Sequence, residues 1–211
     1  ITGLGTVYGM SISTLAAYAF SRKNYPGKRL LFSLMLFTMF FGGGMIPTYL
    51  LIKNLGLINS RAAIILMMGV SPFNIIVMKT GFEQTPESLE EAARIDGANE
   101  LTIFWRVMLP LQLPIIATFT LFTAVAYWNE WFWSTLIINS GSRIPLQVFL
   151  RGIVSSAALE GDISSSSVEE RLFTQGVKMA AMVATMLPVM VIYPFLQRYF
   201  VKGVMIGAVK M

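Results

Sequence analysis

Residues 85–110, TPESLEEAARIDGANELTIFWRVMLP, form a polar, acidic and helix-forming stretch between long apolar segments. Apolar helices alone hold a chain in a bilayer, so lipid does not require a stretch of this kind. We therefore interpret it as a rigid plug that docks into another protein at the membrane face. The alternative, an amphipathic loop that packs on its own chain, is equally compatible with the local chemistry.

Capping residues predict where the first helix of this stretch begins. Thr85 is a good N-cap residue, and Pro86 suits the first helical position, where the N–H that proline lacks is not needed. Glu87 and Glu90 then lie in or near the first turn, where negative charge suits the helix dipole. A narrow apolar stripe at helical spacing follows, formed by Leu89, Ala92 and Ala93.

A glycine turn divides the stretch in two. We expect Gly97 to end the first helix in a left-handed turn, because glycine adopts positive φ without steric cost. Asn99 follows as the N-cap of a second short helix over residues 100–108. Leu109-Pro110 is expected to end that helix and to lead into the next apolar segment. The sequence thus predicts two short helices at a fixed angle.

The chain as a whole is too apolar for a soluble domain. Of its 211 residues, 55% are hydrophobic and 13% are charged, with a mean hydropathy of +0.66, against about 45–50% and about 25% in soluble domains. We therefore expect an all-α, polytopic membrane protein. The absence of cysteine and histidine excludes disulfides, thiol nucleophiles, zinc sites with those ligands and imidazole acid–base chemistry.

Five apolar segments approach the roughly 20 residues that a helix needs to cross the hydrocarbon. We expect them near residues 1–20, 30–51, 62–78, 113–138 and 177–200. Pro72 lies in the third segment, and Pro188 and Pro194 lie in the last, where neighbouring helices must satisfy the freed carbonyls. Three glycines at residues 42–44 interrupt the second segment and predict close helix approach or local unwinding.

Basic residues set the expected orientation. The loop after the first segment, SRKNYPGKR, carries Arg22, Lys23, Lys28 and Arg29, and the positive-inside rule makes such a loop cytoplasmic. Alternation then puts residues 79–112 inside and residues 139–176 outside. Because five segments leave the N-terminus outside, we expect a sixth span upstream in the full protein.

Polar side chains within apolar segments are candidates for a translocation pathway, because lipid burial of such groups is costly. Glu130 and the adjacent Asn129 are the first candidates, although Glu130 also suits a structural hydrogen bond or an outer interface beside Trp128 and Trp131. Asn74 in the third segment is another, and there we favour a helix–helix hydrogen bond.

Several kinds of chemistry are not expected of this chain. It has no glycine-rich phosphate loop ending in Lys-Ser or Lys-Thr, so we do not expect it to hydrolyse ATP. We find no candidate catalytic residues and no metal site, and expect no cofactor in the chain itself. The net charge is +5, and the basic residues that produce it lie beside apolar segments. This placement favours a role in membrane orientation over nucleic-acid binding.

The chain resembles the sugar branch of the ABC importer permeases, including the second maltose permease subunit and permeases for oligosaccharides and uronate sugars. The resemblance is carried by the family's EAA motif, here EEAARIDGA ending at Ala98, followed by Val107-x-Leu109-Pro110. Residues 126–131, AYWNEW, and the tail FVKGVMIGAVK also match. Val107 stands where the family usually has isoleucine. The resemblance covers essentially the whole chain.

The resemblance implies a single permease domain over residues 1–211, with a cytoplasmic coupling loop at 85–110 and an extracytoplasmic loop at 139–176. A coupling helix over residues 89–95 would sit in a cleft of an ATPase subunit. The resemblance assigns the contacts with that subunit to the motif residues Glu90, Glu91, Ala92, Ala93, Arg94, Asp96, Gly97, Leu109 and Pro110.

The resemblance further implies a bacterial inner membrane complex. The chain would pair with a second permease, an ATPase dimer that binds ATP and Mg²⁺, and an extracytoplasmic solute-binding protein, which would meet loop 139–176. The tail over residues 201–211 would reach toward the ATPase dimer. The cargo would be a sugar, most simply an oligosaccharide and in one version an acidic uronate of the alginate type, moved by ATP-driven alternating access.

Two other classes of function remain open at this point. An ion-coupled secondary transporter should carry ionisable residues deep in several spans, whereas here only Glu130 qualifies. A scaffolding membrane protein would use the acidic loop only as an interaction site. For loop 139–176 the alternative is a disordered connector, and Ser167 with Glu170 predicts a capping box for the last helix.

Overall fold

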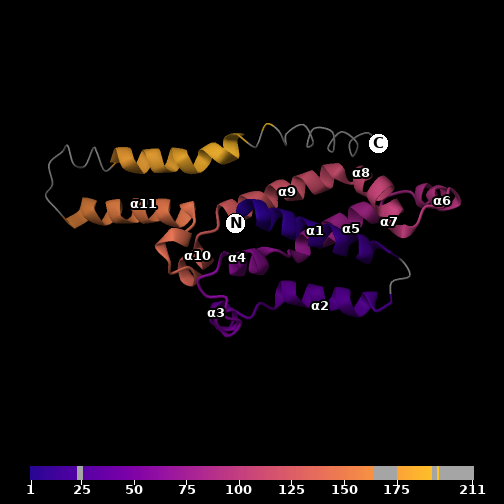
Figure 1. The fold of residues 1–211 in the computed structure, drawn as a ribbon, viewed down its shortest axis with the longest axis horizontal. Coiled ribbons are helices and arrows are strands. Elements are labelled where there is room, and N and C mark those ends of the chain that lie inside the picture. Colours follow the sequence, from indigo (N-terminus) through magenta and orange to yellow (C-terminus); the bar gives the residue numbers. More distant parts are fainter. Residues whose placement is uncertain (23–25, 164–174, 192–193, 195–211) are drawn as a thin grey trace.

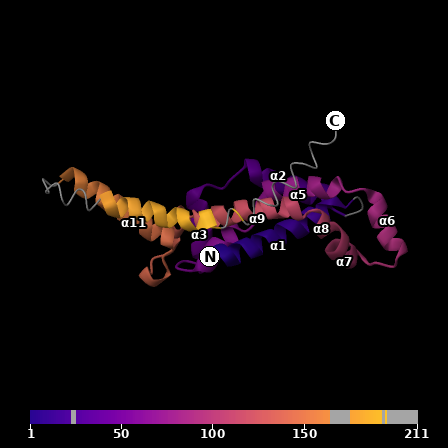
Figure 2. The same ribbon diagram turned by 90° about the horizontal axis from the view of Figure 1, so that it is seen from above.

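The computed structural model describes residues 1–22, 26–163, 175–191 and 194 of the chain. Every regular element in these ranges is a helix, which confirms the all-α expectation. The molecule is elongated, with α6 (Glu87–Ile95) at one end and α11 (Leu146–Ile163) near the other (Figures 1 and 2). The predicted capping box at Ser167 and the tail beyond residue 200 lie outside the described residues.

Within the described ranges, no helix taken alone combines the length and apolar character needed to cross a bilayer. Three pairs of consecutive helices do so by length and composition when each pair is taken together, and each pair is bent at a short break. The pairs are Lys28–Phe40 with Met45–Asn54, Arg61–Met68 with Pro72–Glu83, and Glu100–Leu111 with Leu113–Trp128.

Helix α1 (Thr2–Ser21) lies at the centre and packs against α4 (Arg61–Met68), α5 (Pro72–Glu83) and α9 (Leu113–Trp128) (Figure 1). Small residues recur every four positions on its buried face, which lets neighbouring backbones approach closely. These residues are Gly5, Gly9, Ser13 and Ala17. A Cβ on Gly9 would lie only 2.5 Å from the carbonyl oxygen of Gly69.

The second expected segment is broken at its glycines. Helix α2 (Lys28–Phe40) and helix α3 (Met45–Asn54) meet at 118°, and Gly44 at the break has a φ of +85°. No atom lies closer than 3.9 Å to a Cβ built on these glycines. The structure therefore supports local unwinding and not close helix approach. In the described chain α2 buries none of its residues.

The third expected segment contains two helices, because a capped break precedes Pro72. Helix α4 begins after Ser60, whose Oγ accepts from the Ala62 N–H at 3.2 Å. Helix α5 begins at Pro72 and is capped by Ser71, whose Oγ accepts from the Asn74 N–H at 3.4 Å. Proline thus starts a helix here, as its fixed φ favours. The expected end at Met78 was wrong, since α5 continues to Glu83.

The fourth expected segment, 113–138, is also interrupted. Helix α9 ends at Trp128, and α10 (Phe132–Ile137) follows after three residues. After a 3₁₀ turn (Gly141–Arg143), α11 occupies much of what was expected to be an outer loop, so the alternative of a disordered connector is wrong up to Ile163. A further helix, Gln175–Val191, lies beside α11, and it includes the expected kink residue Pro188.

Hydrogen bonds clamp two short loops together near α10. Asn59, which has a φ of +60°, accepts with Oδ1 from the N–H groups of Asn139 (3.2 Å) and Ser140 (3.0 Å). The guanidinium of Arg143 donates to the Asn59 carbonyl at 2.8 Å, and Arg61 donates to the Arg143 carbonyl at 3.3 Å. These two arginines are therefore structural ties between loops that lie far apart in sequence.

The contact between α1 and α4 can be tested with Gly9→Ala. The added methyl must displace the Gly69 carbonyl, and such overpacking costs about 1–3 kcal/mol. We expect a lower Tm of the purified protein in detergent. Gly3→Ala is the matched control, because nothing lies within 4 Å of its Cβ position and alanine favours helix more than glycine. Equal effects of both substitutions would contradict the packing described here.

Candidate functional site

The acidic stretch forms a compact unit at one end of the molecule (Figures 1 and 2). It contains α6, α7 (Glu100–Ile103), a π-helical turn (Phe104–Met108) and α8 (Leu109–Leu111). We call residues 85–111 the coupling unit. The expected pair of short helices is present, and each of its joints is set by a specific hydrogen bond.

The turn between α6 and α7 is the predicted glycine turn. Gly97 has a φ of +81°, and its N–H donates to the Arg94 carbonyl at 3.0 Å. The Ala98 N–H donates to the Ala93 carbonyl at 2.9 Å, the 6→1 bond of a Schellman motif. This pairing satisfies the last carbonyls of α6 and fixes the direction in which the chain leaves it.

The predicted N-cap of the second helix is also confirmed. Asn99 Oδ1 accepts from the N–H and from the hydroxyl of Thr102, both at 2.8 Å. Gly97 and Asn99 therefore both form short-range hydrogen bonds, each to a residue three positions away in the sequence. Their geometry fixes the path of the chain between α6 and α7.

The predicted N-cap of the first helix was wrong. Helix α6 begins at Glu87 after Pro86 and has no side-chain cap. The Thr85 hydroxyl instead accepts from Gln112 Nε2 at 3.1 Å, and the same amide nitrogen donates to the Gly81 carbonyl at 2.9 Å. Gln112 is buried, so its amide must find partners within the chain, and it takes Thr85 as one of them.

The predicted helix end at Leu109-Pro110 was also wrong. The Leu109 N–H donates to the Phe104 carbonyl, a π-type bond that widens the turn before Pro110. Proline then occupies the first turn of α8, where no N–H is required. The helical path ends at Leu111, and the chain bends by 77° before α9 begins at Leu113.

The faces of α6 differ in exposure. Ala93 packs against the core cluster of the chain, and Glu90 is partly buried. Glu91, Ala92 and Asp96 are exposed. Large apolar side chains are exposed on the same unit, with Ile95 at 86%. The others are Leu89, Leu101, Trp105 and Leu111. Of the two motif alanines, only Ala92 therefore faces outward.

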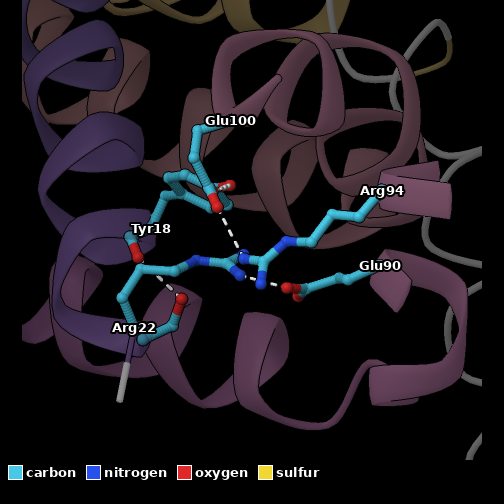
Figure 3. A network of polar contacts seen from close by, with 6 residues as sticks. Tyr18, Arg22, Glu90, Arg94 and Glu100 are labelled. Atoms are coloured by element: carbon cyan, nitrogen blue, oxygen red, sulfur yellow. Dashed lines mark hydrogen bonds and ion pairs between the residues drawn. The ribbon is translucent and has the colours of Figure 1, made fainter. Parts of the chain in front are cut away.

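Charged groups tie the coupling unit to the C-terminal end of α1 (Figure 3). Arg22 forms an ion pair with Glu90 on α6, and its guanidinium lies 4.0 Å from the ring centroid of Tyr18. The Tyr18 hydroxyl donates to Glu100 at 3.3 Å, and Arg94 pairs with the same carboxylate at 2.5 Å. Sequence reasoning missed these contacts, although the basic loop and the acidic stretch already offered opposite charges.

A second group of ion pairs joins the start of α2 to the end of α5. Lys79 Nζ lies 2.6 Å from a carboxylate oxygen of Glu83, and Lys28 Nζ lies 3.8 Å from the other. Lys28 also donates to the Arg22 carbonyl at 3.1 Å. The basic loop and the acidic stretch therefore lie on one side of the molecule, as the alternation of segments predicted.

The candidate pathway residues have different surroundings. Glu130 is buried, and its carboxylate accepts from the Trp133 N–H at 2.6 Å, the Ser134 N–H at 3.2 Å and the Ser134 hydroxyl. These bonds cap the start of α10. Glu130 also lines a cavity of about 200 Å³ that Arg61 and Arg143 share. A structural role for Glu130, as the cap of α10, therefore accounts for all of these hydrogen bonds.

The two asparagines also differ. Asn74 Nδ2 donates to the Thr123 hydroxyl at 3.3 Å, which joins α5 to α9 as expected for a helix–helix hydrogen bond. Asn74 borders a cavity of about 300 Å³ between these helices. Asn129 is exposed after the last residue of α9. The structure does not bring Asn74, Asn129 and Glu130 together around one cavity.

Comparison with known proteins gives consistent matches. Residues 9–206 match the family described as "Binding-protein-dependent transport system inner membrane component". The whole chain is 44% identical to Protein LplC of Bacillus subtilis (strain 168), covering 71% of it. It is 45% identical to the polygalacturonan/rhamnogalacturonan transport system permease protein YtcP of the same organism, covering 74% of it.

A solved structure has the same fold. It is a bacterial ABC transporter involved in the import of the acidic polysaccharide alginate. The alignment has a TM-score of 0.83 and 36% sequence identity, and it covers 94% of this chain and 71% of the solved chain.

The role of Glu130 can be tested with two substitutions. Glu130→Ala leaves buried N–H groups of α10 without an acceptor, a loss of about 1–3 kcal/mol, so we expect a lower Tm. Glu130→Gln keeps an acceptor oxygen and should lower the Tm less and preserve transport. Ser134→Ala, which removes only one donor, is the matched control. Loss of transport in Glu130→Gln at an unchanged Tm would instead make Glu130 a pathway residue.

Proposed function

We propose that this chain, which belongs to the family of binding-protein-dependent inner membrane transport components, is the permease subunit of a sugar ABC importer. The relative of 45% identity is named as a transport permease, which supports a role for the chain as the translocation path and not as the ATPase. The observation that carries the proposal is 45% identity, over the whole of this chain and 74% of the relative, to a permease named for polygalacturonan and rhamnogalacturonan.

The cargo that we propose is an acidic oligosaccharide rich in uronate. Two kinds of similarity support this choice. One relative is named for polygalacturonan, and the similar solved structure belongs to an importer of an acidic polysaccharide. Both names describe polymers that carry carboxylates on their sugars. We therefore place the cargo in the acidic class and not among neutral oligosaccharides.

We propose that the complex consists of this chain, a second permease, an ATPase dimer that binds MgATP, and an extracytoplasmic solute-binding protein. The chain would cross the bacterial inner membrane several times, with the bent helix pairs among its spans. ATP-driven closure of the ATPase dimer would switch the permease pair between outward-facing and inward-facing forms. Asn129, which is exposed, and the cavity beside Asn74 are the candidate pathway sites.

The coupling unit has the properties that such a complex requires. Its exposed face carries Glu91, Ala92 and Asp96 together with Ile95, and we propose that this face enters a cleft of the ATPase subunit. Ala93 and Leu109 lie toward the chain's own core cluster. Because one side of the unit packs on the chain's own core, a force applied to its exposed side displaces the core as well as the unit.

The covalent route out of the unit leads through α8 into α9. Helix α9 packs against both α1 and α5, and Phe119 of α9 is part of the buried core cluster. Movement of Pro110 and Leu111 therefore displaces a helix that is already packed into the centre of the chain. Well-packed interiors deform little, so they pass such displacements on.

The cargo class is tested by uptake into proteoliposomes that contain the whole complex. We expect ATP-dependent uptake of an oligogalacturonide at least about tenfold faster than uptake of a maltooligosaccharide of equal length, a difference of about 1.4 kcal/mol. Vesicles without the ATPase are the control. Uptake that needs no ATPase would contradict the importer proposal, and faster uptake of the neutral sugar would contradict only the acidic class.

The glycine turn offers a test of coupling. Gly97→Val forces a β-branched residue into a left-handed conformation, which such residues almost never adopt and which asparagine tolerates. We expect the complex to hydrolyse ATP with reduced sugar uptake per ATP. Gly97→Asn is the matched control and should remain coupled, because asparagine tolerates positive φ. The open space around Gly97 means that the side chains themselves cause no clash, so normal coupling in Gly97→Val would refute the role of the turn.

A further inference from the structure

Five polar side chains form a closed circuit through three helices (Figure 3). Beginning on α6, Glu90 pairs with Arg22, and Arg22 lies over the ring of Tyr18 on α1. The Tyr18 hydroxyl bonds Glu100 on α7, and Glu100 pairs with Arg94, which returns the circuit to α6. Glu90 and Arg94 are four positions apart on α6, so both face the same side of that helix.

A circuit of this kind fixes more than a single ion pair does. One contact between α6 and α1 leaves the helix free to rotate about it. Two contacts on α6, reached from α1 and α7 respectively, remove that rotation. The circuit therefore sets both the angle between α6 and α7 and the position of their joint on the end of α1.

An aromatic base supports the circuit. The Tyr18 ring packs edge-on against Phe82, with centroids 5.6 Å apart, and in a tilted arrangement against Phe104, with centroids 4.7 Å apart. Phe82 and Phe104 are both buried in the core cluster, so the Tyr18 hydroxyl and ring face are held in place. Arg22 thus stacks on a surface that belongs to the rigid interior and not to a mobile side chain.

Because the ion pair between Arg22 and Glu90 is partly buried, the charge of Arg22 depends on this one carboxylate. The side chains of Arg22 and Glu90 are only 22% and 15% exposed, so water screens them less than an ordinary surface pair. Nε and Nη2 of Arg22 are buried without a hydrogen-bond partner. Glu90 is therefore the carboxylate that compensates this guanidinium, and its loss leaves a partly buried positive charge.

We propose that Arg22 and Glu90 are positioning residues that carry movement of the coupling unit directly into α1. This inference rests on the proposed importer function. It adds a second, non-covalent route to the covalent one through α8 and α9. Because α1 packs on α4, α5 and α9, a push at its cytoplasmic end reaches all three helices together.

The transport test uses the assembled complex with Arg22→Met, which keeps a long apolar stem and removes the charge. We expect normal retention of the ATPase, because Arg22 is not on the exposed docking face, and sugar transported per ATP reduced about fivefold or more, as coupling losses of this kind give. The exchange Arg22→Glu with Glu90→Arg should restore much of that ratio. Arg29→Met, which removes an exposed arginine in the first turn of α2, is the matched control.

A distance measurement separates positioning from general instability. The chain contains no cysteine, so spin labels at Ser88→Cys and Leu15→Cys report the distance between α6 and α1. The complex without these two substitutions is the control for labelling at other sites. We expect one narrow distance distribution with Arg22 present and a broad one in Arg22→Met. The exchanged pair should narrow it again.

The outcomes distinguish this inference from the proposed function. If the wild-type complex retains no ATPase or transports nothing, the importer function fails. If the wild type transports and Arg22→Met shows an unchanged transport ratio and an unchanged distance distribution, the positioning role is refuted. Failure of the exchanged pair to recover either quantity, while Arg29→Met behaves as wild type, would also overturn the specific pairing of Arg22 with Glu90.

Discussion

The need to satisfy backbone N–H groups wherever an apolar helix breaks is the constraint on which this structure depends. An N–H that leaves its helix in a low-dielectric environment costs free energy unless another acceptor is near. Ser60, Ser71 and Asn99 supply that acceptor at three helix starts, and Glu130 does so for α10. At these four helix starts a polar side chain marks where the chain turns, whereas the break between α2 and α3 lies at glycines and has no side-chain cap.

The same reasoning joins the fold to the mechanism. A bent helix with a capped break keeps a defined angle, so displacement at one end reaches the other. Gln112 illustrates this at the bend between α8 and α9, where its buried amide ties Gly81 and Thr85 to the start of α9. The coupling unit is thus attached at α9 by the chain itself and at α1 by the Arg22–Glu90 pair, and both helices belong to one packed core.

Sequence reasoning succeeded or failed according to the range of the interaction. Gly97 and Asn99 were predicted correctly because each acts within one helical turn of itself. Thr85 was predicted to cap α6, but a glutamine 27 positions away uses its hydroxyl instead. Pro110 was predicted to end a helix, but a π turn adjusts the backbone before it. The expected loop after residue 139 contains α11, whose helical character the long-loop interpretation did not anticipate.

The sequence by itself determined the all-helical class, the glycine turn, the side of the molecule on which the acidic stretch lies, and the family resemblance carried by residues 90–110. These follow from composition and from contacts between neighbours in the chain. Only the tertiary structure decided that Ala93 faces inward while Ala92 faces out, and that Arg22 meets Glu90 across 68 positions. The physical reason is that a charged or small side chain has many suitable partners along a sequence, and only the packing of the helices selects one.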